Sequence, residues 1–141
     1  MLNPEHIGIA VKELNTAIPL FEKLLNTPCY KREKVAAEKV NTAFFKCGQT
    51  KIELLENDGE EEGVISQFIS KKGEGVHHIA FAVENIWDEM KRLQAEGFTL
   101  LNAEPKVGAD NKLICFLHPR DTKGVLIELC MEKPVGYQPT A

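Results

Sequence analysis

The sequence contains no apolar run of the roughly 20 residues that a membrane-spanning helix requires. The segment Met1–Glu5 also lacks the basic and apolar regions of a secretory signal. There is no basic excess either, because the formal net charge is -4 and the pI is about 5.6, whereas binding to a nucleic-acid backbone needs a basic face. We therefore expect a cytoplasmic protein that has neither a membrane nor a nucleic acid as a partner.

The four cysteines form no CxxC pair, so in a chain without a secretory signal they indicate reduced core thiols. The apolar fraction of 43% and the charged fraction of 27% are typical of ordinary globular proteins. A chain of 141 residues is long enough for one domain with a sizeable core. We predict a single domain at residues 1–133 and a tail at 134–141 that has two prolines and little to bury.

An internal repeat organises the domain, because His6-Ile-Gly-Ile-Ala-Val11 returns as His78-Ile-Ala-Phe-Ala-Val83. Each copy is followed by a helical pattern and then by three strand-like runs, so both halves predict the order β-α-β-β-β. The first module covers residues 4–57, the second covers 75–132, and the linker at 58–74 contains a short helix. The predicted fold class is α+β.

Capping residues and turn residues give the expected bounds of the elements. Asn15 and Asn85 are the expected N-caps of the two main helices, which end at Asn26 and at Gly97. The strand-like runs that follow the helices are 29–33, 40–46 and 51–56 in the first half and 98–101, 112–117 and 125–131 in the second.

Each copy of the repeat begins with a histidine on a distinctive strand face. Alternate side chains of a strand point to opposite faces, so His6 shares its face with two small residues while the large apolar side chains lie on the other. His78 likewise shares its strand face with two small residues, and the large apolar side chains of its strand lie on the other face. Small residues beside a histidine leave room for a bound molecule.

The last strand of each module carries a carboxylate within an apolar run, Glu53 in the first module and Glu128 in the second. An ionised carboxylate in such surroundings costs several kcal/mol unless it is paired or binds a metal. Two imidazoles and two carboxylates suit a divalent metal such as cobalt, nickel, zinc, manganese or iron. A single strand His or Glu is more often structural, so the prediction rests on the repetition: His6, Glu53, His78 and Glu128.

Longer segments resemble the methylmalonyl-CoA epimerase family of the vicinal oxygen chelate superfamily. The resemblance covers nearly the whole chain from His6 to Glu132 and is carried by the following segments: the repeat at 6–11, Gly48-Gln-Thr-Lys-Ile-Glu-Leu-Leu55, Gly73-Glu-Gly-Val-His-His-Ile-Ala-Phe-Ala-Val83, Phe116-Leu-His-Pro119 and Gly124-Val-Leu-Ile-Glu-Leu129. It implies the glyoxalase fold, in which two paired βαβββ modules form a cupped eight-stranded sheet around the metal. The same resemblance implies a homodimer and a role in propionate metabolism.

The resemblance also implies the reaction, which is epimerisation of (R)- and (S)-methylmalonyl-CoA. A proton leaves and returns at the α-carbon through a metal-stabilised enediolate, and the partner is therefore a small CoA thioester. The implied ligands are His6, His78 and Glu128, with Glu53 where the family has Gln or Glu. Cobalt is the first expectation for the ion, with zinc, nickel or manganese as alternatives. Glu128 is the first candidate for the acid/base group and Glu53 the second, because a carboxylate can loosen from the metal to take a proton. The segment 40–45 lacks the further Glu that some epimerases use, so the sequence leaves the identity of the second base open.

Two other functions fit the superfamily pattern: a glyoxalase I-type lyase, which would use the same four ligands, and a metal-free binding protein of the bleomycin-resistance type. An extradiol dioxygenase fits less well because it needs two His, one carboxylate and iron. His77 points to the opposite strand face from His78 and is interpreted as a packed or surface residue, and His118 is a weak ligand-contacting candidate. Basic residues that are available for the CoA phosphates are Lys71, Lys72, Lys106, Lys112, Arg120 and Lys123.

Overall fold

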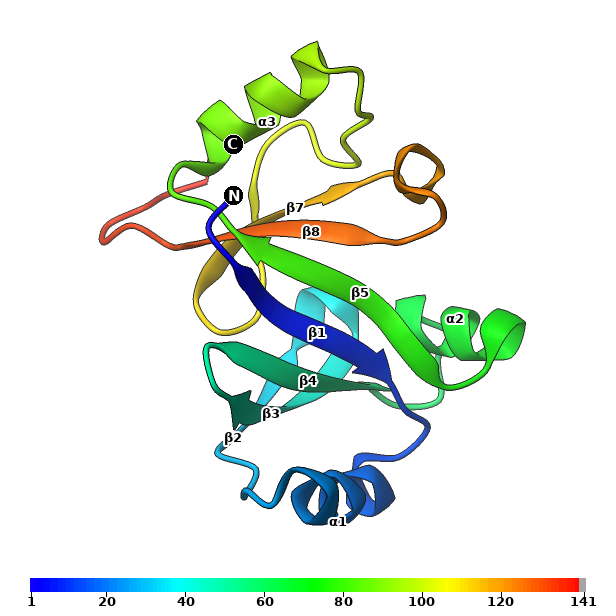
Figure 1. Cartoon of the computed structure of the whole chain (residues 1–141). Coiled ribbons are helices and arrows are strands. Elements are labelled where there is room, and N and C mark those ends of the chain that lie inside the picture. Colours follow the sequence, from blue (N-terminus) through cyan, green and yellow to red (C-terminus); the bar gives the residue numbers. More distant parts are fainter. Residues whose placement is uncertain (140–141) are drawn as a thin grey trace. The chain divides into compact units, whose positions relative to one another are not determined.

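The structure is a computed structural model that describes residues 1–139. In this range no helix is both long and apolar enough to span a membrane. The elements follow one another along the chain as drawn in Figure 1: β1 (Pro4–Ala10), α1 (Leu14–Leu25), β2 (Lys31–Val35), β3 (Val40–Cys47), β4 (Thr50–Asn57), α2 (Val64–Lys72), β5 (Gly75–Ala82), α3 (Ile86–Ala95), β6 (Lys106–Val107), β7 (Lys112–Leu117) and β8 (Ile127–Glu132), with short 3-10 helices at Ala36–Glu38 and Pro119–Thr122.

The strands belong to one eight-stranded sheet with the order β2-β3-β4-β1-β5-β8-β7-β6. Each half of the chain repeats the order of one strand, one helix and three strands, which confirms the predicted α+β class and the two βαβββ modules. The chain divides into two compact units, the first unit at residues 6–78 and the second unit at residues 1–5 together with the chain from 79 onward. Both β1 and β5 therefore contribute to both units.

In the first unit, α1 and α2 cover opposite faces of the strands. Leu14 and Ala17 of α1 pack in one core cluster with Leu54 of β4. Its strand neighbour Leu55 points the other way and packs with Ile65 of α2. The face that α2 partly covers is therefore the face of Leu55, on which the predicted ligands of this unit also lie.

The second unit has a corresponding two-faced arrangement. One face of β7 and β8 packs against α3 in a cluster of buried side chains from Val83, Ile86, Met90, Leu93, Leu113, Cys115, Leu117 and Leu129. The other face carries a smaller cluster of Ala80, Ile114 and Cys130, with Phe116 packed against it. This smaller cluster lies on the face of Glu128, because Glu128 and Cys130 are two residues apart on β8.

The helix caps were predicted correctly in one half and wrongly in the other. Asn85 caps α3 as expected, since its Oδ1 accepts the backbone N–H of Asp88 at 3.0 Å. The prediction of Asn15 as the cap of α1 is wrong, because the helix begins at Leu14 after Glu13. The backbone N–H of Leu14 donates to the Glu56 carboxylate of β4 at 2.9 Å. A side chain distant in sequence therefore accepts a free N–H group of the first helical turn, which a local N-cap residue would otherwise accept.

The predicted strand at 98–101 is also wrong, since only Leu100 makes an isolated bridge, to Leu117. The edge strand beside β7 is instead the short β6. The backbone N–H of Thr99 donates to the Asp121 carboxylate at 2.7 Å rather than to a strand. The other predicted strands begin and end within two residues of their observed bounds.

Part of the predicted tail at 134–141 packs on the second unit. Tyr137 contacts the core cluster beside α3, and its ring centroid lies 6.1 Å from that of Trp87. The last two residues of the tail lie outside the described residues.

Candidate metal centre

The strand β1 places its chemically distinctive residues on one face. His6, Gly8 and Ala10 are buried, whereas Ile7 and Ile9 between them are only half-buried. The parallel pairing of β1 with β4 sets Gly8 opposite Glu53, so the carboxylate lies on the face of His6. Glu53 and His6 thus come together through strand register alone.

His78 joins this pair by lying across Gly8. A Cβ atom at position 8 would stand 2.2 Å from the Cε1 atom of His78 and 2.7 Å from its Nε2 atom. No side chain larger than hydrogen fits at that distance. Gly8 therefore makes the space into which the imidazole of His78 fits.

The three side chains converge on one point in the first unit. The Nε2 atoms of His6 and His78 are 3.0 Å apart, and His78 Nε2 is 3.9 Å from Glu53 Oε1. All three offer a ligand atom within 4.8 Å of the others. Brought this close together, the two imidazoles and the carboxylate would hold one divalent ion.

All three side chains are buried, and burial keeps His78 in the form that a metal ligand needs. His6, Glu53 and His78 are 6%, 4% and 4% exposed. Burial, and then the neighbouring His6 and His77, hold the pKa of His78 well below its ordinary value. The imidazole is therefore neutral near pH 7 and has a lone pair to give. A buried carboxylate beside the neutral imidazole of His78 is most stable when a cation lies between them, so the donor set fits a divalent ion.

His77 has a position in the site that its strand phase did not predict. Its Nδ1 atom lies 2.9 Å from Nδ1 of His78, and its ring stands edge-on to Phe68 of α2 with the centroids 4.9 Å apart. If His78 offers its lone pair at Nε2, its proton lies on Nδ1 and is donated to His77. The pKa of His77 is lowered by burial and by Lys72, which keeps this imidazole available as the acceptor.

Glu128, the fourth predicted ligand, belongs to the second unit and is 5% exposed. Its strand neighbours there are Ala80 on β5 and Phe116 on β7. Glu53 has the matching neighbours Gly8 on β1 and Phe44 on β3. The repeat seen in the sequence is therefore a repeat of strand register around each carboxylate.

His118, the weaker candidate, has a local structural task. Its Nδ1 atom accepts the backbone N–H of Arg120 at 3.1 Å, and it caps the 3-10 helix at Pro119–Thr122. The side chains that β3 places beside Glu53 are Phe44 and Thr42, and the Thr42 hydroxyl donates to the Glu33 carbonyl at 2.8 Å. Neither Phe44 nor Thr42 is an acid or base near neutral pH.

A family comparison matches residues 5–116 of this chain to the Glyoxalase/Bleomycin resistance protein/Dioxygenase superfamily. The chain is 39% identical over 134 residues to the uncharacterized protein YqjC of Bacillus subtilis, covering 95% of this chain and 94% of that protein. It is also 34% identical over 125 residues to the ethylmalonyl-CoA/methylmalonyl-CoA epimerase of Cereibacter sphaeroides, covering 88% of this chain and 93% of that enzyme.

Among solved structures, a variant of the Streptomyces coelicolor methylmalonyl-CoA epimerase in complex with 2-nitronate-propionyl-CoA is similar to this chain with a TM-score of 0.89. The two are 29% identical, and the match covers 95% of this chain and 99% of that one.

The close approach at Gly8 gives a first prediction. The change Gly8→Ala should push the His78 ring aside and weaken binding of Co²⁺ by about tenfold or more, as is usual when the support of a ligand is lost. Titration with Co²⁺, followed by absorbance and competition with a chelator, measures the affinity. Ile7→Val, on the opposite face of β1, should leave the affinity unchanged. Unaltered binding in the Gly8→Ala protein would contradict this role of the glycine.

The lowered pKa of His78 gives a second prediction, for the metal-free protein. Because the folded-state pKa lies below the ordinary 6.5, the unfolded chain binds more protons in the window below that value. Stability therefore decreases as the pH falls below about 6.5. Urea unfolding at pH ~5 to ~7.5 should show this slope in the wild type, a smaller slope in His78→Gln and an unchanged slope in His118→Gln. Equal slopes in wild type and His78→Gln would show that His78 is not the source.

Proposed function

We propose that this chain, which belongs to the Glyoxalase/Bleomycin resistance protein/Dioxygenase superfamily and within it to the methylmalonyl-CoA epimerases, interconverts (R)- and (S)-methylmalonyl-CoA in propionate metabolism. The observation that supports this most is the buried cluster of His6, Glu53 and His78, whose ligand atoms lie within 4.8 Å of one another. Relatives whose names specify this reaction match 88% of the chain at 33% to 34% identity.

The proposed metal site has four ligands: His6, Glu53, His78 and Glu128. Glu128 is included because its strand neighbours repeat those of Glu53. This proposal requires residues 1–133 to act as a single domain, since Glu128 belongs to the second unit and the other three to the first. When bound, a divalent ion, with cobalt as the first choice and zinc, nickel or manganese as alternatives, would supply Lewis-acid stabilisation of the enediolate.

The acid and base work falls to the two carboxylates. Inversion at the α-carbon needs one group that takes the proton from one face and one that returns a proton to the other. Glu128 is the first of these groups and Glu53 the second. On β3, Phe44 and Thr42 occupy the face of Glu53 and neither is a carboxylate, which supports Glu53 for the second role.

The decisive experiment incubates one epimer with the Co²⁺-loaded protein in deuterated water. We expect deuterium at the α-carbon together with conversion to the other epimer, and loss of both when a chelator removes the metal. Glu128→Gln and Glu53→Gln should each slow conversion by about 10²- to 10⁴-fold, the usual contribution of a general acid or base. The exposed Glu104→Gln is the matched control.

Absence of both exchange and conversion in the metal-loaded wild type would overturn the proposed reaction. Isomerisation of the hemithioacetal of methylglyoxal and glutathione in the same preparation would instead identify a glyoxalase I-type lyase. A protein that is purified without chelators, contains no metal and turns over neither substrate would fit the metal-free binding class.

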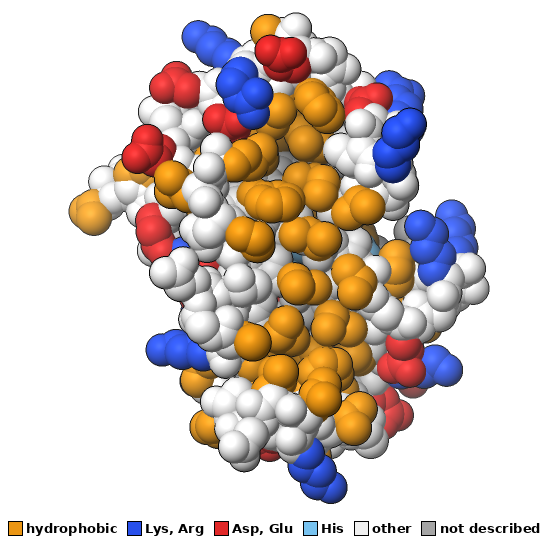
Figure 2. Space-filling view, in the orientation of Figure 1, with side chains coloured by type: hydrophobic (Ala, Val, Ile, Leu, Met, Phe, Trp, Pro, Cys, Tyr) orange, Lys and Arg blue, Asp and Glu red, His pale blue; other side chains and the backbone are white. Residues whose placement is uncertain are grey.

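We also propose that the chain is a homodimer. On β1 the half-buried Ile7 and Ile9 point away from the face of His6, and on β5 Ile79 and Phe81 alternate with the buried His78 and Ala80. In Figure 2 the side chains over β1 and β5 are mostly hydrophobic. Exposed apolar area of this kind typically marks an interface.

Light scattering coupled to gel filtration should give a mass twice that of the chain, and Ile7→Lys with Phe81→Lys should give the single-chain mass. The exposed Leu24 of α1, changed to Lys, is the control and should leave the dimer intact. A wild-type protein that elutes as a monomer at micromolar concentration would refute the dimer.

A further inference from the structure

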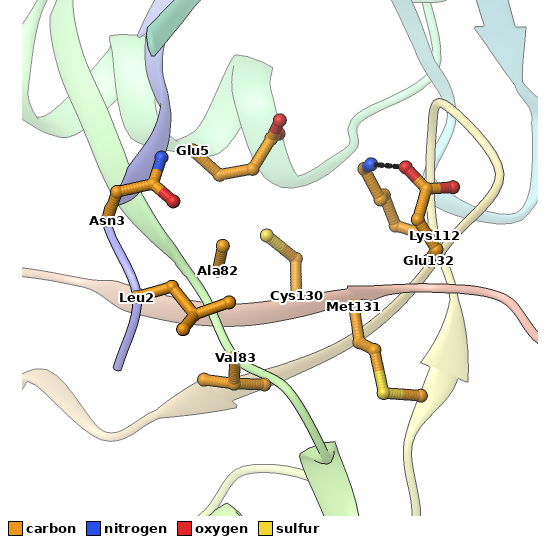
Figure 3. A pocket seen from close by; sticks show the side chains of 9 residues that line it. All are labelled: Leu2, Asn3, Glu5, Ala82, Val83, Lys112, Cys130, Met131 and Glu132. Atoms are coloured by element: carbon orange, nitrogen blue, oxygen red, sulfur yellow. Dashed lines mark hydrogen bonds and ion pairs between the residues drawn. The ribbon is translucent and has the colours of Figure 1, made fainter. Parts of the chain in front are cut away.

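A cavity of about 240 Å³ lies in the second unit, and its wall combines apolar groups with one buried cation. Figure 3 shows the lining side chains, with the Cys130 thiol near the centre and the Lys112 ammonium beside the Glu132 carboxylate. The lining residues are Leu2, Asn3, Glu5, Ala82, Val83, Lys112, Cys130, Met131 and Glu132.

Strand register places Lys112 and Cys130 of this cavity on the face of Glu128. Phe116 pairs with Glu128, Ile114 with Cys130 and Lys112 with Glu132 in the antiparallel ladder of β7 and β8. Residues at every second position share a face, so Lys112 and Cys130 point to the same side as the proposed base. The cavity follows Glu128 along β8, with Cys130 between Glu128 and Glu132.

The charge of Lys112 is unusual in its burial. Lysine is almost never fully buried unless it is paired, and Lys112 is 7% exposed. Its Nζ contacts Glu132, whose own side chain is 72% exposed. An ammonium group has three N–H donors, and Glu132 is the one carboxylate that the structure gives it among residues 1–139. A partner that is largely in water can turn away and leave the ammonium to a ligand.

The dimensions and charges of the cavity limit what it can bind. Pockets for drug-sized ligands have volumes of roughly 300–1,000 Å³, so about 240 Å³ suits a short acyl group rather than a nucleotide. Leu2 and Ala82 offer apolar contacts for a small branch. Glu5 on the β1 side would repel an anion, which leaves the Lys112 end as the place for a carboxylate.

We propose that Lys112 binds the free carboxylate of the acyl group and so selects malonyl-type thioesters over thioesters of monocarboxylic acids. This inference rests on the proposed function, because it assigns Lys112 to the substrate of the same site. The ammonium takes the carboxylate in place of Glu132 and keeps its charge paired throughout. An uncharged acyl group has no carboxylate that could replace Glu132 beside the ammonium, so Lys112 adds nothing to its binding affinity.

Equilibrium binding to the metal-loaded full chain tests the inference with two probes, malonyl-CoA and propionyl-CoA, followed by calorimetry. Lys112→Gln should weaken malonyl-CoA binding about tenfold or more, as for a lost hydrogen bond to a charged group, and leave propionyl-CoA binding unchanged. Lys112→Arg should restore most of the loss. The exposed Lys91→Gln of α3 is the control.

Glu132→Gln separates ligand binding from a structural ion pair. It removes the competitor for the ammonium, so malonyl-CoA should bind as tightly as in the wild type or more tightly. Equal losses for both thioesters in Lys112→Gln, or a loss in Glu132→Gln as large as in Lys112→Gln, would overturn the inference. Lys112-dependent binding of malonyl-CoA in a protein that exchanges no α-proton of methylmalonyl-CoA would support it while refuting the proposed reaction.

Discussion

The contact between the His78 ring and the backbone at Gly8 is the constraint on which the candidate metal centre depends. A Cβ at position 8 would lie only 2.2 Å from the imidazole. Adding a single methyl group there would therefore displace the His78 ring from the metal centre. Register then supplies Glu53 opposite the same glycine, and alternation along β1 supplies His6. Of the three donors, His78 is therefore the one whose position depends on the missing side chain at Gly8.

Much of this arrangement could be predicted from the sequence, because strand alternation and helix caps depend on residues that are close together in the chain. Alternation of small and large residues around His6 and His78 correctly assigned their faces, whereas the pairing of Glu53 with β1 is a finding of the structure. The Asn85 cap and the bounds of β7 were predicted for the same reason, since each depends on neighbouring residues. The repeat also predicted the order of the elements in both halves.

The features that sequence reasoning missed are those set by residues distant in the chain. The first helix begins before Asn15 because Glu56 of β4 accepts its first N–H, and Thr99 is drawn to Asp121 rather than into a strand. His77 was judged by strand phase alone, but its ring turns so that Nδ1 meets Nδ1 of His78. No pattern in the sequence predicts that Lys112 is buried, because its burial depends on the pairing of β7 with β8.

The matched neighbours of Glu53 and Glu128 also restrict how the length of this chain can change in evolution. Inserting or deleting one residue within β4 or β8 would rotate every later side chain to the opposite face and turn the carboxylate away from its Gly8 or Ala80 neighbour. Length variation is therefore tolerated only between the strands, as in the acidic segment 58–63 that precedes α2. Homologous chains that retain the chemistry should differ in length there and agree residue for residue along the two carboxylate strands.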